Sequence, residues 1–548
     1  MSEREFQFTR RQGLKFFGAA GLAAMAPSIL GMDSAHAQAA PKGQVIVGFS
    51  QEPTIFNPHL LHAAADEGVH YAVYDPLFDV DPEGNFYPLL AAEVPTVENG
   101  GISADGLTYR IKLRDDVKWH DGKPFTAEDV KFTLELMVNP DFRSWRRSGH
   151  NRVRDLTVVS PTEITWRMET PYAPYSAILA STFIVPKHVF EGVDPNNSPL
   201  SIAPVGTGAY KWKNRVPGDH IELEANTDYF GDGPYLERIV LKYIPDLTVL
   251  YTQLKTGDID VAGLQYISPD NYEEAKTLPD RVVEVIGNPN TEGLCLNLQR
   301  PQFKELAVRQ ALYYALDKQT IIDALYYGVP PVNESYMPHE NYYYNSNLPA
   351  HEYNLDKARA LLDEAGWAPG AGGIREKDGV RLSFVCSTTS GNHLREQAQQ
   401  FIQQSFREIG VDMQISNLPA AVMWGDHWML SQFDVALAGV YPLTGPDPDT
   451  SHYFHSGASA AKGGQGQNIW CYANPEMDEL LTKGSSVVSP QERLPIYHRI
   501  QEIMRHDLPF LPIYQYAVIR GYKAGIEGIK GNINNRIDTW NVRSWRRV

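Results

Sequence analysis

The sequence predicts an α/β protein with two lobes and an additional small α+β domain. Its 548 residues exceed what one hydrophobic core normally supports, so the chain must divide into several domains. Two stretches far apart in the sequence, 238–262 and 382–415, each have the strand–helix–strand pattern of a parallel βαβ unit. A third stretch, 107–138, predicts short strands followed by a capped helix. We therefore expect one α/β lobe around each βαβ unit.

Composition and charge exclude several classes of protein. With 43% hydrophobic and 21% charged residues, the chain resembles globular rather than disordered or membrane proteins. A formal net charge of −17 makes it a poor partner for nucleic acid or anionic lipid. Cys295, Cys386 and Cys471 form no CxxC motif, and we interpret them as small buried residues. One disulfide between two of them remains an alternative.

Residues 1–37 are predicted to be an export signal. Residues 9–15 contain a twin-arginine motif, and the Ala- and Gly-rich stretch 16–30 is too short to span a bilayer. Ala35-His36-Ala37 gives a cleavage site before Gln38. A Sec signal with a chance arginine pair is the alternative. Because no cysteine lies near the cleavage site, we expect no membrane anchor and a periplasmic location.

The stretch 107–138 is the most regular part of the chain. An alternation of Leu107, Tyr109, Ile111 and Leu113 with polar residues predicts a half-buried strand. Val117 to His120 is predicted to form a second, short strand. Thr126 is the expected N-cap, with Asp129 as its capping-box partner, of a helix from Ala127 to Val138.

The amino-acid sequence of this stretch, LTYRIKLRDDVKWHDGKPFTAEDVKFTLE, resembles the signature of the family 5 extracytoplasmic solute-binding proteins. These are the dipeptide-, oligopeptide- and nickel-binding subunits of ABC importers. QEPTIFNP at 51–58, GTGAY at 206–210 and NIWCY at 468–472 are similar to other parts of the same family. The resemblance implies a type II periplasmic-binding-protein-like fold of two lobes, with the small α+β domain inserted in the first lobe.

The resemblance also implies how the domains divide the chain. The predicted parts are the signal peptide (1–37), three segments of lobe I (43–80, 201–285 and 515–548), the small α+β domain (81–200) and lobe II (286–514). Two lobes joined by crossing segments can close over a ligand by hinge motion. The hinge candidates are Ile286 to Glu292 and Pro509 to Tyr516.

Further elements follow from periodicity and from capping residues. We expect strands at Val45–Phe49, 382–386, 411–415 and Phe433–Ala438, a hairpin turn at Pro217–Asp219, a βαβ unit made of Arg238–Ile244, Leu247–Thr256 and Ile259–Ala262, and helices at Phe303–Leu316, after Asp317, after Asn354 and at 394–409.

No catalytic motif is complete, so we expect neither an enzyme nor a cofactor. GxSxG and GxxxxGK[ST] are missing from the sequence. His339-Glu340 and His351-Glu352 begin like zinc motifs but lack the second histidine. The run Asp447 to His455 offers carboxylates and imidazoles to a metal, although a loop leading into a capped helix with solvated histidines is the favoured interpretation.

The resemblance implies which residues contact the ligand. In the dipeptide-binding members, a W-x-G-D-N-G-D-P-D run supplies an aspartate for the ligand's ammonium group. Here Tyr441 stands at the Trp position and Thr444 at that Asp position, while Thr389 aligns with the arginine that meets the ligand's carboxylate. The candidate contacts are Gln51, Glu52, Asn57, Thr389, Tyr441, Thr444, Asp447, Asp449 and Trp470. Tyr441 and Trp470 are two of several aromatic residues near the predicted cleft, and the other candidates are polar. The aromatic residues there are Tyr342, Tyr343, Tyr344, Trp424, Trp428, Tyr441 and Trp470.

Because Thr389 and Thr444 stand where dipeptide-binding members have the two ionic partners of the ligand, we expect a different ligand. A buried ammonium or carboxylate without a counter-charge costs several kcal/mol, which disfavours a free zwitterionic dipeptide. A longer peptide or a neutral compound such as an oligosaccharide would suffer no such penalty, and Asp447 or Asp449 could replace the missing anion. We therefore expect a monomeric periplasmic protein that captures a peptide or similar organic solute and delivers it to an ABC permease in the inner membrane. A metal- or cofactor-binding carrier is the alternative.

Overall fold

The computed structural model describes residues 40–548 except 145 and 535–536, so the predicted export signal lies outside the described residues. Among the described helices, none is long and apolar enough to cross a membrane. A ten-stranded mixed sheet dominates this part of the chain, in the order β16-β15-β17-β11-β18-β10-β1-β9-β8-β7. Its strands are β1 (Gln44–Phe49), β7 (Tyr210–Val216), β8 (His220–Ala225), β9 (Arg238–Tyr243), β10 (Val261–Ile267), β11 (Arg281–Leu296), β15 (Ser383–Ser387), β16 (Asp412–Ile415), β17 (Val435–Val440) and β18 (Phe510–Lys523).

Both predicted βαβ units are confirmed. In the first, β9 and β10 each pair in parallel with β1, and α4 (Leu247–Thr256) connects them. Asp246 caps α4 by accepting hydrogen bonds from the backbone N–H groups of Thr248 and Val249 at 2.8 and 3.0 Å, and Gly257 ends it with a φ of 86°. In the second unit, β15 and β16 pair in parallel, and α9 (His393–Glu408) connects them.

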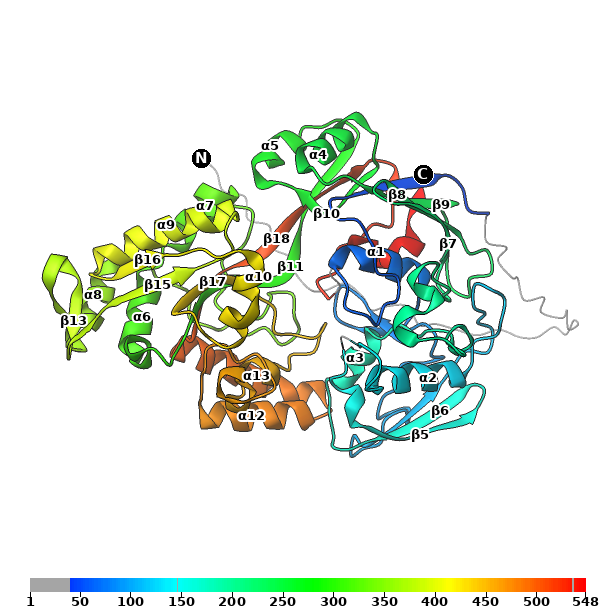
Figure 1. Ribbon diagram of the computed structural model, residues 1–548, viewed down its shortest axis with the longest axis horizontal. Helices are drawn as coiled ribbons and strands as arrows, with labels where there is room; N and C mark the ends of the chain where they lie inside the picture. Colours follow the sequence, from blue (N-terminus) through cyan, green and yellow to red (C-terminus); the bar gives the residue numbers. More distant parts are fainter. Residues whose placement is uncertain (1–39, 145, 535–536) are drawn as a thin grey trace, which may run out of the picture. The chain divides into compact units, whose positions relative to one another are not determined.

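Two long antiparallel strands, β11 and β18, join the two halves of the sheet (Figure 1). On one side, β18 pairs with β10 of the first half, defined as β10, β1, β9, β8 and β7. On the other side, β11 pairs with β17 of the second half, defined as β17, β15 and β16. The β11–β18 register shifts between Gly287 and Thr291 and again between Glu292 and Gly293. Apart from Pro509, both predicted hinge segments lie within these two strands.

The buried hydrophobic side chains gather into separate clusters along the chain. One cluster surrounds the first half of the sheet and includes Val47, while another, built between Leu77 and Ile184, centres on Trp119 and Trp166. The latter covers the small sheet β4-β6-β5 (Thr108–Lys112, Glu163–Met168 and Val153–Ser160) and α2 (Ala127–Val138). Further clusters pack against the second half and include Leu437 and Trp470. We propose that these cores correspond to the predicted domains.

Several further helices take part in the polar network and the cavity described in the following paragraphs. They are α1 (Ala64–Val73), α3 (Tyr175–Ala180), α6 (Leu306–Tyr314), α7 (Lys318–Tyr326), α8 (Leu355–Glu364), α11 (Ser451–Phe454), α12 (Pro475–Ser486) and α13 (Pro490–Asp507). The predicted caps are confirmed at α7, where Asp317 accepts a hydrogen bond from the backbone of Thr320, and at α8, where Asn354 accepts one from that of Lys357.

Two predicted elements are wrong in detail. Val117 to His120 forms no strand, only an isolated bridge between Lys118 and Pro124, because the turn at Gly122 leaves too little chain for a ladder. The predicted helix Phe303–Leu316 is broken at Glu305, whose backbone is extended between a 3₁₀ turn and α6. At this position the Glu305 carboxylate accepts a hydrogen bond from Lys377 Nζ at 2.8 Å. All three cysteines are buried and free, as interpreted from the sequence.

The glycines at 206 and 208 permit the chain to return to the first half of the sheet. A Cβ atom on Gly206 would lie 1.8 Å from the carbonyl oxygen of Val73, and one on Gly208 would lie 2.6 Å from that of Ala72. Only glycine allows such a close approach to the end of α1. Between them, the Thr207 hydroxyl donates a hydrogen bond to Asp75 Oδ2 at 2.9 Å, which fixes the loop beside the site described below.

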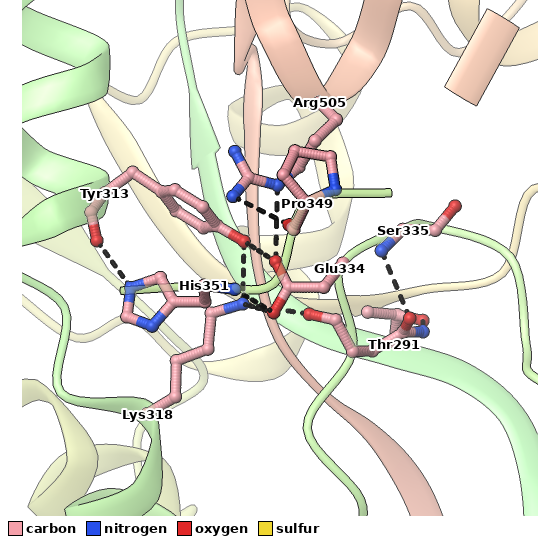
Figure 2. A network of polar contacts seen from close by, with 9 residues as sticks. Thr291, Tyr313, Lys318, Glu334, Ser335, Pro349, His351 and Arg505 are labelled. Atoms are coloured by element: carbon pink, nitrogen blue, oxygen red, sulfur yellow. Dashed lines mark hydrogen bonds and ion pairs between the residues drawn. The ribbon is translucent and has the colours of Figure 1, made fainter. Parts of the chain in front are cut away.

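A buried polar network ties together α6, α7, α13 and the loop that follows α7 (Figure 2). Lys318 Nζ donates to Tyr313 OH at 2.7 Å and lies 3.2 Å from Glu334 Oε1, and Arg505 Nε lies 3.2 Å from Glu334 Oε2. The backbone N–H of His351 also donates to Glu334, at 3.0 Å. Burial lowers the pKa of Lys318 to about 7, although attraction to Glu334 opposes the shift. Glu334 is thus the common partner of two cations.

Replacing Glu334 with alanine should lower the free energy of unfolding by about 3–5 kcal/mol, because it leaves a buried lysine without its counter-charge. Urea unfolding followed by circular dichroism measures the change. The matched control is Glu352→Ala, whose partner Lys357 lies on the surface with both side chains about half exposed. The control should change stability by less than about 0.5 kcal/mol. Equal effects of the two substitutions would contradict the role given to Glu334.

Candidate functional site

A cavity of about 310 Å³ lies between segments that are far apart in the sequence. One wall comes from residues 58–80, which include α1, and from residues 146–183, which include α3. The opposite wall is the loop 441–453 that follows β17, and Asn534 also reaches the cavity. The cavity therefore brings residues of the first half and the small domain against residues of the second half.

The wall formed by α1 is held by one buried carboxylate. Asp66 Oδ1 accepts a hydrogen bond from the backbone of Ile55 at 2.9 Å, and its Oδ2 accepts one from that of Ala63 at 2.8 Å. This side chain is 1% exposed, so the preceding loop is fixed to the start of the helix. Glu67 and Tyr71, one helical turn apart, consequently both line the cavity.

The opposite wall depends on a buried ion pair. Arg493 of α13 meets Asp447 with two parallel bonds, Nη1 to Oδ2 at 2.7 Å and Nη2 to Oδ1 at 2.9 Å. The side chains of Arg493 and Asp447 are only 5% and 8% exposed. Asp447 also accepts a hydrogen bond from the backbone of Asp449 at 2.8 Å, which sets the turn that brings Asp449 to the cavity. The ion pair thus shapes the loop, and Asp449 rather than Asp447 faces the cavity.

Arg146 is a cavity residue that the sequence did not reveal. Its Nη1 donates a hydrogen bond to the Ser181 hydroxyl at 2.8 Å, and both residues line the cavity. Among the described residues that line the cavity, Arg146 is the only arginine, and no lysine is present. No motif marks it, because its position beside the 441–453 loop arises only from the tertiary fold. The cavity therefore contains a guanidinium group that comparison with dipeptide-binding proteins does not predict.

The structure brings together three of the nine candidate ligand contacts. Tyr441, Thr444 and Asp449 line the cavity. The other six do not line it. Glu52 pairs with Arg215 at 2.7 Å, and Asp447 binds Arg493. Asn57 is buried and bonded to its own loop, Trp470 is fully buried against Phe454, and Gln51 and Thr389 lie on loops outside the lining. A hydrogen bond from the backbone of Gly218 is the main cause that lowers the pKa of Glu52. Ligand contact by any of the nine stays a prediction.

The predicted aromatic residues also separate into groups. Tyr343, Trp428 and Trp470 belong to the hydrophobic core of the second half, and Tyr344 packs against it. Tyr342 and Trp424 are 55% and 39% exposed and do not line the cavity. Tyr441 lines it together with Tyr71, Tyr172 and Tyr453, which the sequence did not single out. Tyrosine side chains from both walls thus line the cavity.

The run Asp447 to His455 has the structure of a loop leading into a short helix, α11. His452 lines the cavity, whereas His455 Nδ1 accepts a hydrogen bond from the backbone of Gly457 at 3.0 Å. Within the described part of the chain, no group of three or more His, Cys, Asp or Glu side chains is arranged to hold a metal ion.

Three buried histidines stand behind the first wall. His59 Nε2 is 2.8 Å from the carbonyl oxygen of Phe183, His70 Nε2 is 2.7 Å from that of Ile55, and His150 Nε2 is 3.1 Å from the Thr182 hydroxyl. Burial lowers the pKa of His59 to about 4 and the pKa values of His70 and His150 to about 3. All three are therefore neutral in the folded protein at neutral pH.

Acid should destabilise the protein through these histidines. An unfolded histidine takes up a proton near pH 6.5 and the folded one only near pH 3–4, so the unfolded state binds more protons between these values. The stability contribution is complete above pH 6.5 and is lost as the pH falls, by about 1.4 kcal/mol per histidine and pH unit. Urea midpoints between pH 7 and 5 measure the loss.

Two variants test the assignment. His59→Gln should make the decline shallower, because its amide can still bond to the Phe183 carbonyl but does not titrate. His393→Gln is the control, since that side chain is 86% exposed, and it should leave the slope unchanged. A decline that is unaffected by His59→Gln would show that other groups cause it.

Comparison with known proteins places these features in context. A model of the bacterial extracellular solute-binding proteins, family 5, matches residues 85–462. The oligopeptide-binding protein AppA of Bacillus subtilis is 30% identical over 520 residues, covering 92% of this chain and 91% of its own.

Two solved structures are similar over nearly the whole chain. AppA from Bacillus subtilis in complex with a nonapeptide has a TM-score of 0.74 and 28% identity, covering 93% of this chain and all of the other. NikZ from Campylobacter jejuni in complex with Ni(L-His) has a TM-score of 0.77 and 29% identity, covering 92% of this chain and all of the other.

Proposed function

We propose, because the chain belongs to family 5 of the bacterial extracellular solute-binding proteins, that it is the periplasmic substrate-binding subunit of an ABC importer and carries a short peptide. Membership confirms the resemblance drawn from residues 107–138 and the two-lobed fold of type II predicted with it. The proteins of this family are transport proteins that act outside the cytoplasm. The peptide, the periplasm and the permease are the parts that we propose for this chain.

The similarity to an oligopeptide-binding protein along nearly the entire chain is the observation that carries the proposal. The cavity supports it, because it combines tyrosine rings, an arginine and carboxylates, which suit peptide backbone and termini. Its volume of about 310 Å³ is at the lower end of the ~300–1,000 Å³ typical of small-molecule sites, which favours a short peptide over one as long as a nonapeptide.

Closure over the solute is the mechanism we propose. The irregular register of β11 and β18 offers a place where the two halves can rotate with little loss of ladder hydrogen bonds. The backbone N–H of Ala173, next to the lining residue Tyr172, donates to the Ser485 carbonyl of α12 at 2.8 Å, a contact that opening of the two halves would break. A ligand that touches both walls stabilises the closed form, and the permease would recognise that form.

Export and assembly complete the proposal. A twin-arginine signal would carry the folded protein into the periplasm, where it would act as a monomer without a membrane anchor and without enzymatic activity. A ligand acquired in either compartment would then remain bound until the protein meets the permease.

Protein purified from the native periplasm should contain peptide. Denaturing the protein and analysing the released small molecules by liquid chromatography and mass spectrometry should give peptides in near-equimolar amount. Elemental analysis of the same sample tests the metal-carrier alternative, for which NikZ with Ni(L-His) is the precedent. Equimolar nickel or an oligosaccharide in place of peptide would contradict the proposal.

Arg146 is proposed to bind the carboxyl terminus of the peptide. Arg146→Gln should weaken binding of a peptide with a free carboxylate by about 10- to 100-fold, which corresponds to the loss of one charge-assisted hydrogen bond. The same peptide with an amidated C-terminus should bind both proteins equally. Isothermal titration calorimetry measures both affinities.

The exposed Arg143 provides the matched control, since it lies in the same segment but outside the cavity lining. Arg143→Gln should leave both affinities unchanged. If Arg146→Gln weakens the amidated peptide as strongly as the free acid, Arg146 does not read the carboxylate.

A further inference from the structure

Each wall of the cavity has two aspartates that share a single arginine, and of the four aspartates all but the half-buried Asp449 are buried. On the first wall these are Asp75, Asp79 and Arg543, and on the opposite wall they are Asp447, Asp449 and Arg493. In both groups only one of the two aspartates lines the cavity, namely Asp79 and Asp449. We call these two groups the first and the second Asp–Arg–Asp cluster.

In the first cluster, Tyr87 links Arg543 to Asp79, whose Oδ1 also accepts a hydrogen bond from the backbone of Val80 at 2.7 Å. Arg543 Nη2 donates to Tyr87 OH at 2.9 Å, and Tyr87 OH donates to Asp79 Oδ2 at 2.9 Å. Asp75 accepts hydrogen bonds from Thr207 and from Tyr229, at 2.9 and 3.2 Å. Burial raises the pKa of Asp79, and raises that of Asp75 to about 6, although attraction to Arg543 opposes both shifts. One guanidinium group therefore balances two carboxylates.

In the second cluster, Arg493 is fully engaged by Asp447. Both of its terminal nitrogens bond to that carboxylate, and its Nε donates to the Gly484 carbonyl at 2.9 Å. Asp449 accepts its hydrogen bonds, from the backbone and hydroxyl of Ser451, at Oδ1 alone. No described residue donates a hydrogen bond to its Oδ2. Burial, with repulsion from Asp447, raises the pKa of Asp449.

Counted over their own described residues, the two clusters together contain more carboxylates than guanidinium groups. Each contributes two carboxylates and one guanidinium. In the second cluster Arg493 pairs with Asp447, so Asp449, which lines the cavity, is the carboxylate with the weaker counter-charge. In the first cluster the two carboxylates share Arg543, and Asp79 is the one that lines the cavity. An uncompensated buried charge is costly, so a ligand that brings positive charge to Asp79 and Asp449 recovers free energy that a neutral ligand does not. Arg146, on the same lining, offers the complementary partner for a ligand carboxylate.

We propose that the cavity selects cationic solutes, in which two ammonium or guanidinium groups face Asp79 and Asp449 on opposite walls. This inference rests on the proposed function and gives it a substrate class: short peptides that carry a basic side chain in addition to the free N-terminus. Because each cation would meet a different wall, the ligand's charge would also help to hold the two walls together.

Calorimetric titration with three tripeptides of matched length tests the proposal. The probes are Ala-Lys-Ala, Ala-Met-Ala, whose side chain is of similar length but neutral, and Ala-Glu-Ala. Ala-Lys-Ala should bind about 10- to 100-fold more tightly than Ala-Met-Ala, as expected for one charge-assisted contact, and Ala-Glu-Ala should bind most weakly.

Two single variants connect this preference to the clusters. Asp449→Asn and Asp79→Asn should each reduce the ratio of the Ala-Lys-Ala to Ala-Met-Ala affinities, or weaken both peptides together if the carboxylate meets the N-terminus. Asp356→Asn, which removes a 95% exposed carboxylate on α8, should change neither affinity. Thermal unfolding verifies that each variant is folded, and Asp449, being less buried than Asp79, keeps the test valid if Asp79→Asn unfolds.

The outcomes separate this inference from the proposed function. Equal binding of the lysine and methionine peptides, unaffected by either aspartate substitution, would overturn the charge preference and leave peptide binding intact. Failure of all three peptides to bind would instead contradict the proposed transport of short peptides, and the present inference with it.

Discussion

The pairing of β11 with β18 is the interaction on which the rest of the structure depends. These two strands are the shared centre of the ten-stranded sheet, so they hold its first half and its second half in one unit. Their register shifts between Gly287 and Thr291, which leaves continuous ladders on either side of an irregular middle. Next to it, Arg395 of α9 binds Glu292 with two bonds of 2.7 and 2.9 Å. This ion pair anchors the irregular segment to the second half, so in the proposed closure the first half is the part that turns.

The position of the cavity follows from that arrangement. Its walls come from the small domain with α1 on one side and from the loop after β17 on the other, so rotation about the central strands changes the distance between them. Each wall is braced internally, the first by the hydrogen bonds of Asp66 at the start of α1 and the second by the Asp447–Arg493 pair. Charge that is not balanced within each wall remains available to a solute that contacts both. In the proposed closure, the residues that recognise the solute would therefore also hold the two walls together.

The local structure could be predicted from the sequence wherever periodicity and capping agree. Helix α2 spans the residues predicted for it, and Asp129 accepts the expected hydrogen bond from the backbone of Thr126 at 3.0 Å. Prediction failed at Glu305, where the backbone is extended within a helical sequence pattern and the side chain bonds to the distant Lys377, a tertiary contact that local periodicity does not reveal.

The candidate site was predictable only in part, for a physical reason. Tyr441, Thr444 and Asp449 lie in a segment whose wording is similar to that of relatives, and the structure places them at the cavity. Arg146 and Asp79 carry no local pattern, because distant parts of the fold place them there. Trp470 resembles a stacking residue in sequence but is fully buried. Thr389 and Thr444 predicted the loss of two ionic partners for a ligand. The cavity lining nevertheless contains charged side chains, Asp449 in the same loop as Thr444 and Glu67, Asp79 and Arg146 in other segments.

The most direct test of solute capture is a distance measurement across the cavity. Spin labels placed on the exposed residues Glu191 of the small domain and Glu479 of α12 would report how far apart the two sides are, by pulsed electron paramagnetic resonance. The protein would be stripped of ligand by unfolding and refolding, and then saturated with a casein peptide hydrolysate. The account predicts a broad or longer distance without ligand and a single shorter distance with peptide. The same distribution in both samples would contradict it.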